Sequence, residues 1–236
     1  MKELIKFILN IFDFFTQQKI LNALKKEIKG NKISVLIDVG SHKGEYILSL
    51  KSKFLVEKIF GFEPNPDIYN LVNKKFSTSN NIIVFNYGIS DSSGVIEFNK
   101  NLESSSSSMN NLNTNSKYYK KKFFLLNFLN LKKITTKINV EVKRLDEFFK
   151  LHKIQKVDLI KIDTEGFEFR VLKSLGQNIR NIKIIHFEHH FDDMIIKNYK
   201  FSDIHHYLVC NGFKKIFKIK MKFRKSFEYI YVNKEY

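Results

Sequence analysis

The sequence predicts an α/β fold of Rossmann-like type, with a mostly parallel sheet and helices on both faces. Apolar runs rich in β-branched residues alternate with segments of helical periodicity along much of the 236-residue chain, as in parallel sheets built from strand–helix–strand units. A glycine-containing turn follows the first apolar run. An acid directly follows each of four apolar runs, namely Asp38, Glu63, Asp163 and Glu188. Since ligands of such folds bind at the carboxyl ends of the strands, these acids mark one expected site.

Length and charge limit the organisation of the chain and its partners. We expect an N-terminal helical arm over residues 1–30 and one domain over 31–236, long enough to bury a substantial core. The 41 Lys and Arg against 24 Asp and Glu give a formal net charge of +17. Nucleic acid, anionic lipid and acidic substrates all suit such a charge. Because the lysines are spread along the chain, a compositional bias is the favoured explanation.

Residues 1–28 predict one or two helices, because apolar residues recur at helical spacing and no glycine or proline precedes Gly30. Flanking lysines are compatible with a helix that lies on the inner face of a membrane. Packing on the domain, or a dimer contact, is the more ordinary role. Charged residues interrupt the apolar run and no small-residue cleavage site follows it, so we expect a cytoplasmic protein.

Residues 34–64 predict the first half of a nucleotide-binding strand–helix–strand unit. The unit begins with the apolar run 35–37, which is followed by Asp38 and by two glycines, Gly40 and Gly44. A helical segment at 45–55 comes next, and then a second apolar run at 59–62 that leads to Glu63.

Each residue of this unit has a separable physical role. Gly40 permits a sharp turn after the strand, and Gly44 leaves room for a ligand to approach the backbone. Glu63 falls where such folds present a carboxylate to the two ribose hydroxyls. The order D-x-G-x-x-x-G lacks the G-x-G-x-x-G pattern that binds a pyrophosphate. A nucleoside ligand without phosphates, such as S-adenosylmethionine (SAM), fits this pattern.

After Glu63 the chain is expected to continue the alternation. Pro66 is well placed in the first turn of a helix, and residues 82–86 predict a third short strand. Turn residues at 91–94 precede the alternating segment 95–98, and together they predict an added hairpin.

Residues 99–138 are the least regular part of the chain and are expected to be a low-complexity insertion. The serine- and asparagine-rich run 103–111 is too polar to bury. The segment 123–129 is a compact apolar patch that predicts an anchoring turn.

The last third of the chain resumes the alternation. A strand is expected at 139–142, and then a helix from residue 145 with Asp146 as its N-cap. The single cysteine, Cys210, excludes an intrachain disulfide framework and is expected to be a buried helix residue. The remaining elements are expected at 157–162 (strand), 167–175 (helix ended by Gly176), 182–187 (strand), 202–211 (helix), and 213–219 with 228–232 (antiparallel pair).

Four ordered motifs together resemble the FkbM-type family of SAM-dependent methyltransferases. They occupy residues 38–44, 62–66, 88–94 and 159–168, and the matching region runs from about residue 34 through most of the chain. The resemblance implies a seven-stranded sheet whose last inserted strand is antiparallel. It also implies SAM as cofactor and, as acceptor, the hydroxyl of a sugar in a surface glycan or glycolipid. The implied cofactor-binding residues are Asp38, Gly40, Gly44, Glu63, Pro64, Ile89 and Asp91.

Methyl transfer from a sulfonium to an oxygen needs positioning and removal of one proton. The candidate general bases are Asp163, which leads, and then Glu165, Glu188, His189 and His190. Asp163, Glu188 and His189 are also of the ligand types that magnesium or manganese accepts. A divalent cation is therefore a second, weaker expectation.

Two other functions are compatible with the sequence. The acceptor hydroxyl could belong to a lipid or a natural product, with the same cofactor. The chain could also be a basic nucleic-acid-binding protein on a methyltransferase-like scaffold, although no compact aromatic and arginine stripe supports this, and no specific nucleic acid is expected.

Overall fold

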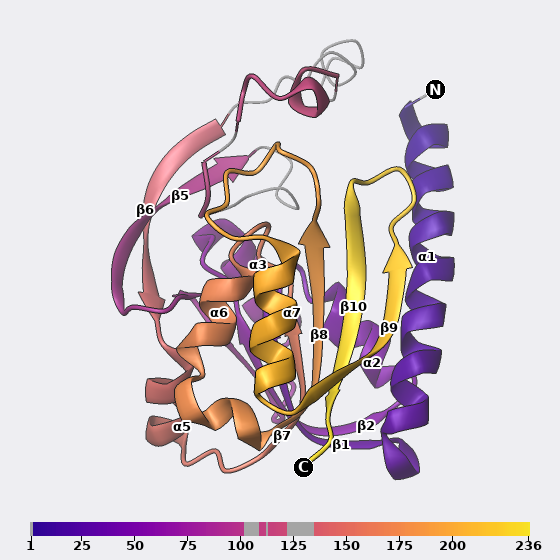
Figure 1. Cartoon of the computed structure of the whole chain (residues 1–236), viewed down its shortest axis with the longest axis vertical. Coiled ribbons are helices and arrows are strands. Elements are labelled where there is room, and N and C mark those ends of the chain that lie inside the picture. The colour runs from indigo at the N-terminus through magenta and orange to yellow at the C-terminus, as the bar shows by residue number, and fades with distance from the viewer. Residues whose placement is uncertain (1, 102–108, 112, 122–134) are drawn as a thin grey trace.

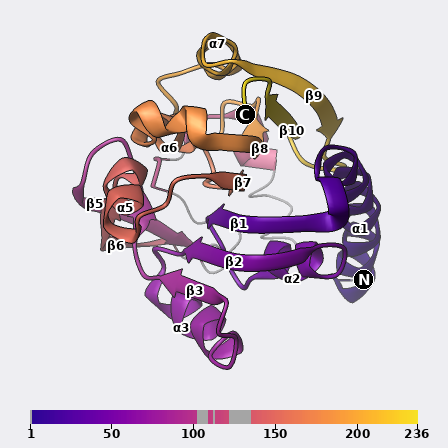
Figure 2. The ribbon, with the colours of Figure 1, turned by 90° about the horizontal axis from the view of Figure 1, so that it is seen from below.

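The computed structural model describes residues 2–101, 109–111, 113–121 and 135–236. A seven-stranded sheet lies between two layers of helices (Figures 1 and 2). The strand order is β3-β2-β1-β7-β8-β10-β9. The strands are β1 (Lys32–Val39), β2 (Leu55–Phe62), β3 (Ile82–Phe85), β7 (Val157–Ile162), β8 (Ile182–His190), β9 (Phe213–Lys220) and β10 (Ser226–Asn233).

The direction of the strands confirms the expected mostly parallel sheet. β10 is inserted between β8 and β9 and is antiparallel to both, whereas β3, β2, β1, β7 and β8 are parallel to one another. The central strands are buried on both faces, which is why they read as nearly continuous apolar runs.

The helices divide into two layers, each with its own hydrophobic core (Figure 2). One layer contains α1 (Lys2–Glu27), α2 (Glu45–Lys51) and α3 (Pro66–Lys75), and the other contains α5 (Leu145–His152), α6 (Glu168–Ser174) and α7 (Phe201–Cys210). Ile20, Leu21 and Leu24 of α1 are buried in the first core, so the second half of α1 packs on the domain. None of the described helices is both long enough and apolar enough to cross a bilayer.

A second sheet has the order β4-β6-β5 and corrects the predicted hairpin. Its strands are β4 (Gly88–Ile89), β5 (Gly94–Asn101) and β6 (Thr135–Lys143). The partner of β5 is the distant β6, which is antiparallel to it, and not the strand that precedes the turn. This pairing spans the insertion, and the predicted runs within 102–108 and 123–129 lie outside the described residues.

Several predicted boundaries were wrong for local reasons. α2 ends at Lys51 and β2 already begins at Leu55, so the predicted helix 45–55 was too long. β8 continues through His190 because Ser226 of β10 pairs with that residue. The N-cap of α5 is Arg144, and its side chain binds the carboxylate of Asp146 in the first turn.

The prediction that Cys210 is buried was also wrong, because its side chain is exposed. The buried face of α7 is formed by Ile204 and Leu208, which are four residues apart. Cys210 follows Leu208 by two residues, or about 200° around the helix, and therefore points to solvent.

Candidate active site

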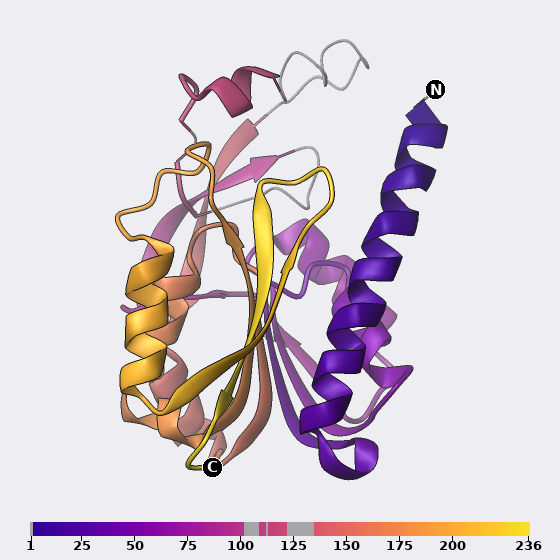
Figure 3. The same ribbon diagram turned by 45° about the vertical axis from the view of Figure 1, so that its right-hand side comes forward.

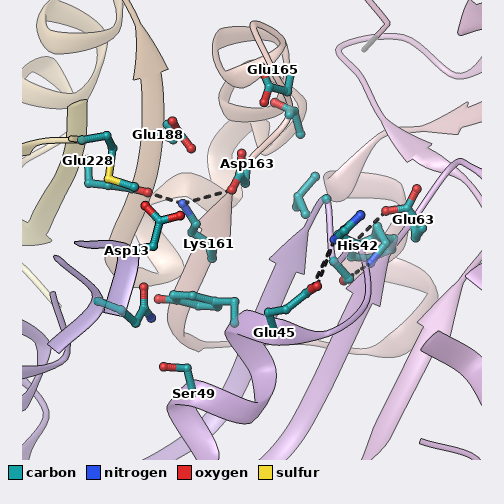
Figure 4. A pocket seen from close by; sticks show the side chains of 18 of the residues that line it. Asp13, His42, Glu45, Ser49, Glu63, Lys161, Asp163, Glu165, Glu188 and Glu228 are labelled. Atoms are coloured by element: carbon teal, nitrogen blue, oxygen red, sulfur yellow. Dashed lines mark hydrogen bonds and ion pairs between the residues drawn. The ribbon is translucent and has the colours of Figure 1, made fainter. Parts of the chain in front are cut away.

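A cavity of about 880 Å³ opens at the carboxyl ends of the central strands. It is bounded by the turn after β1, by α2, by residues 13–18 of α1 and by the loop between β9 and β10. Lys161, Asp163, Glu188 and Glu228 line one side, while Glu63 and Pro64 line the other (Figure 4). The acids that end separate strands therefore meet at one edge of the sheet.

Strand alternation decides which side chains reach this cavity. Successive residues of a strand point to opposite faces, so Glu188 of β8 lies on the α1–α3 face. Its neighbours Phe187 and His189 lie on the other face. Lys161, Glu228 and His186 share the face of Glu188 and form one buried cluster.

Lys161 is the centre of this cluster and is only 3% exposed. Its Nζ lies 3.1 Å from Glu228 Oε2 and 3.8 Å from Asp163 Oδ2 (Figure 4). Burial would lower the pKa of Lys161, but the carboxylates of Glu228 and Asp163 hold that pKa above its ordinary value. The same pairing outweighs burial at Glu228 and holds the pKa of Glu228 well below its ordinary value. Lys161 and Glu228 are therefore an ion pair.

Two further side chains extend the cluster toward α2. His186 Nε2 lies 2.9 Å from Glu228 Oε2, and the hydroxyl of Tyr46 lies 2.8 Å from His186 Nδ1. Burial and the charge of Lys161 lower the pKa of His186, so the ring is neutral at pH 7. The nearby Glu228 carboxylate favours a proton on Nε2 of the neutral ring, which leaves Nδ1 to accept from the Tyr46 hydroxyl.

Asp163 and Glu188 are the two carboxyl groups that face the open cavity beside Lys161. Burial raises the pKa of Asp163 despite the nearby lysine, although 39% of its side chain is exposed to the cavity. Burial, with the charges of Asp163 and Glu228, raises the pKa of Glu188 to about 8. At neutral pH Glu188 thus keeps a proton that it can donate in a hydrogen bond. A carboxyl group that keeps its proton at neutral pH is typical of acid–base sites.

Glu165 lies on the same rim in a left-handed backbone conformation, with φ of +49°. Its Oε2 lies 3.0 Å from His190 Nε2. Although burial opposes it, the carboxylates of Glu165, Asp192 and Glu188 raise the pKa of His190 to about 11. His190 is therefore a cation held among carboxylates. Among the residues that the structure describes, no group of three or more His, Cys, Asp or Glu is arranged to hold a metal ion.

Glu63 lies on the other side of the cavity and is 6% exposed. Its Oε2 accepts a hydrogen bond from the backbone N–H of His42 at 2.9 Å, and its Oε1 accepts one from Asn65 at 2.9 Å. A carboxylate has about four acceptor positions, so each oxygen retains one for a ligand. Two such acceptors side by side match a vicinal diol. Pro64 and Ile89 also line the cavity.

The two glycines serve the packing of the protein itself. Gly40 has φ of +85°, and a Cβ there would lie 2.0 Å from the carbonyl oxygen of Asp163. Gly44 has φ of +76°, and a Cβ there would lie 2.4 Å from the ring of Phe76. Gly40 lies at the cavity, whereas Gly44 packs against α3. The room that Gly44 was expected to leave for a ligand is taken up by the ring of Phe76.

Besides Gly44 and His190, three residues predicted for the site lie outside the lining of the cavity. Asp38 is 1% exposed beneath it, and burial raises the pKa of Asp38 to about 7. Asp91 pairs with Lys173 at 2.8 Å and so joins the β4–β5 turn to α6. His189 Nδ1 faces Glu168 Oε2 at 3.5 Å within the α5–α7 layer. This position removes His189 from the predicted metal ligands and general bases.

Sequence reasoning missed Lys161, His186 and Glu228. The signal was present, because each is a polar residue inside an otherwise apolar strand and all three project to one face. The pair formed by Asp13 and Arg224 at 2.7 Å was also missed. These residues are far apart in the chain, and no local pattern connects them.

Known proteins share this architecture. A family model described as the methyltransferase FkbM domain matches residues 38–215. Hexuronic acid methyltransferase AglP of Haloferax volcanii is 27% identical over 183 residues, which are 76% of this chain and 65% of AglP. The chain thus spans slightly less than two thirds of that relative.

Two solved structures share the fold at low sequence identity. The FkbM methyltransferase of Methylobacillus flagellatus KT is similar with a TM-score of 0.53 and 13% identity, over 85% of this chain and 44% of that one. Magnesium protoporphyrin IX methyltransferase of Synechocystis PCC 6803, solved with bound SAM, is similar with a TM-score of 0.53 and 10% identity, over 94% of this chain and 80% of that one.

Proposed function

This chain belongs to the FkbM methyltransferase family, and from that premise we propose that it transfers a methyl group from SAM to a hydroxyl of a sugar. The observation that carries the proposal is the two-sided cavity. A diol-binding carboxylate, Glu63, lies on one side, and Asp163 with Glu188 lies on the other. A nucleoside cofactor and a hydroxyl acceptor would each meet the polar groups that they need.

The lining of the cavity fits SAM. Glu63 retains two acceptor positions for the ribose hydroxyls. Asp163, Glu165 and Glu188 line the opposite side, and nearby carboxyls favour a ligand that carries a positive sulfonium. When bound, SAM supplies an electrophilic methyl group on that sulfonium.

Asp163 is the proposed general base. Its carboxylate would accept the proton that the acceptor hydroxyl gives up when its oxygen takes the methyl group from SAM. Lys161 and the Glu228 pair hold the Asp163 carboxylate in place from below. Protonated Glu188 donates a hydrogen bond that can orient a second hydroxyl of the acceptor.

A sugar in a glycan or glycolipid is the proposed acceptor. The support is the relative AglP, a hexuronic acid methyltransferase, together with a cavity rich in carboxyls that hydrogen-bond to hydroxyls. Asp163 and Glu188 would also be the ligands of a magnesium or manganese ion, if one binds an acceptor diol. Treatment with EDTA tests this, since turnover that is lost and then restored by the metal would add the ion to the mechanism.

The deciding experiment is mass spectrometry of surface glycans from cells with and without this chain. We expect the glycans of cells without the protein to lack one methyl group, a mass decrease of about 14 Da. Expression of the parent chain should restore it. The Asp163→Asn variant should not restore it. The glycans could instead be unchanged while extracts show methyl transfer from SAM to a lipid or natural-product hydroxyl. That result would replace the sugar with another acceptor and leave the methyltransferase activity in place.

A further inference from the structure

An exposed aromatic tip lies beside the mouth of the cavity. It consists of Phe14 and Phe15 of α1, each 59% exposed, and of Phe223 in the β9–β10 loop, 67% exposed. Figure 3 shows α1 standing beside the hairpin of β9 and β10, with its N-terminal end extending past the hairpin. Three large apolar rings are thus presented on protruding elements, where burial in the core cannot explain them.

The two elements are joined, so the aromatic tip is one surface. The rings of Phe12 and Phe223 are in edge-on contact, with centroids 5.3 Å apart. Asp13 Oδ2 and Arg224 form an ion pair at 2.7 Å. Phe223 also has φ of +61°, a backbone conformation that is costly for an aromatic residue. That conformation keeps its ring on the outside of the loop.

The hairpin beside the aromatic tip is strongly basic. Residues 213–226 contain no acid and seven cations, namely Lys214, Lys215, Lys218, Lys220, Lys222, Arg224 and Lys225. β9 is an edge strand of the sheet, and most of its residues are exposed. Arg224 is paired with Asp13, and the six lysines leave an excess of positive charge that attracts an anionic surface.

We propose that the aromatic tip docks on an anionic lipid bilayer. The three phenylalanine rings would enter the boundary between headgroups and acyl chains, while the hairpin cations lie on the lipid phosphates. Clusters of basic residues beside exposed aromatic rings bind membranes through this combination. Charge complementarity selects this occupant over a second copy of the chain, because two such hairpins repel each other.

The shape of the surface favours a bilayer over a nucleic acid. Single-stranded nucleic acids bind in basic grooves whose aromatic rings stack with the bases. Here the exposed rings belong to α1 and to the β9–β10 loop, two elements at the periphery of the molecule (Figure 3). Six of the seven hairpin cations are lysines, which contact phosphates as point charges and lack the bidentate geometry of arginine.

Docking would orient the cavity toward the lipid headgroups. Phe14 of the aromatic tip also lines the cavity, as do Asp13, Met221 and Arg224. A sugar carried on a membrane lipid would therefore reach the cavity from the docked face. This last step rests on the proposed function, whereas membrane docking itself does not.

Sedimentation with sucrose-loaded vesicles tests the docking. The protein is mixed with phosphatidylcholine vesicles that contain about one third phosphatidylglycerol, and separately with pure phosphatidylcholine. We expect binding to the anionic vesicles at least about tenfold stronger, and release at about 0.5 M salt, because salt screens the lysines. Phe15→Ser with Phe223→Ser should lower the bound fraction at least about fivefold. Lys220→Gln, Lys222→Gln and Lys225→Gln should remove the preference for anionic vesicles.

Matched controls separate the surface from general effects. Leu55 and Leu151 are 67% and 76% exposed and lie away from the aromatic tip, so their change to Ser should leave vesicle binding unaltered. Melting temperature and calorimetric SAM affinity report on folding and on the cofactor site independently of lipid.

Three results would overturn the proposal. The first is equal binding of the parent to both kinds of vesicle, and the second is equal vesicle binding by the parent and the Phe15/Phe223 variant. The third is a parent that does not bind vesicles but binds RNA, with the RNA binding abolished in that variant. A parent that binds vesicles but transfers no methyl group would leave docking standing and remove the proposed function instead.

Discussion

Asp163 shares the buried Lys161 with Glu228, and this sharing sets how strongly Asp163 holds its proton. The Lys161 ammonium is 0.7 Å closer to Glu228 than to Asp163, at 3.1 Å against 3.8 Å. The lysine therefore stabilises the ionised form of Glu228 more than that of Asp163, and burial leaves the pKa of Asp163 raised. A carboxylate of raised pKa is a stronger base than an exposed one.

Asp163→Asn keeps the size of the side chain and removes its charge. We expect the fold to remain and the turnover number to fall about 100-fold or more, because the general base is lost. In the parent, turnover should rise with pH through the pKa of Asp163, since only the ionised form accepts a proton. Steady-state kinetics from pH 5 to 9, with melting curves of both proteins, measure this. Near-normal turnover in a stable variant would move the role to Glu188.

Glu63→Gln tests the ribose contact. The amide retains one acceptor oxygen, so we expect cofactor affinity to fall about tenfold or more, as when a buried charged hydrogen bond is lost. Glu57→Gln is the control, because Glu57 is an exposed acid on β2, the strand that Glu63 follows, and is paired with Lys32 at 2.7 Å. Calorimetry with SAM gives both affinities. Equal affinities for parent and Glu63→Gln would show that this carboxylate serves only the turn after β1.

Gly40→Ala separates a steric requirement from a conformational one. Gly30 also has positive φ, +67°, but a Cβ there meets nothing within 4 Å, whereas at Gly40 it meets the Asp163 carbonyl. Gly30→Ala should lower the free energy of unfolding by about 1–2 kcal/mol, and Gly40→Ala by roughly 3 kcal/mol or more. Urea unfolding compares them. Equal losses would show that the contact of a Cβ at position 40 with the Asp163 carbonyl does not lower the free energy of unfolding further.

At the scale of elements, α1 has two halves with different roles. Leu24 is fully buried in its second half, while Ile11 is 38% exposed in its first half. Leu24→Ala should lower the free energy of unfolding by about 2–5 kcal/mol, and Ile11→Ala by less than about 1 kcal/mol. Thermal and urea unfolding give both values. Similar small losses in the two variants would show that α1 is a detachable arm.

Local patterns of the sequence predicted most of the elements but fewer of their contacts. The strands before Asp38, Glu63 and Asp163 were correct, because a parallel strand buried on both faces has an unmistakable apolar run. The pairing of β5 with β6 could not be read, since it crosses an insertion. The assignment of both Glu188 and His189 to one site overlooked strand alternation, which sends adjacent residues to opposite faces.

At the scale of the whole molecule, buried acids make stability depend on pH. The ordinary pKa of Glu188, 4.5, is raised to about 8 in the fold, so the folded state binds this proton more tightly than the unfolded state. Its contribution is fully present below the ordinary value and is lost as the pH rises through about 8. The melting temperature should therefore fall between pH 5 and 9.

Glu188→Gln checks this assignment, because the amide resembles the protonated acid and does not ionise. The variant should show a shallower fall in melting temperature over the same pH range than the parent. His190, whose pKa is raised from 6.5 to about 11, adds a fall of its own above about pH 6.5, and the parent and the variant share that part. Parallel curves for the two proteins would assign the dependence to other groups, such as Asp38.

The insertion of β10 between β8 and β9 has a consequence for biosynthesis. β10 is the last of the seven strands to be translated, yet it lies between β8 and the edge strand β9 and brings Glu228 to Lys161. Until the ribosome has released that strand, Lys161 of the nascent chain lacks its nearer carboxylate, Glu228, and β9 has no strand to pair with. A premature stop codon between β9 and β10 would therefore leave a protein whose parallel strands are present but whose β8 is an open edge, a natural target for quality-control proteases.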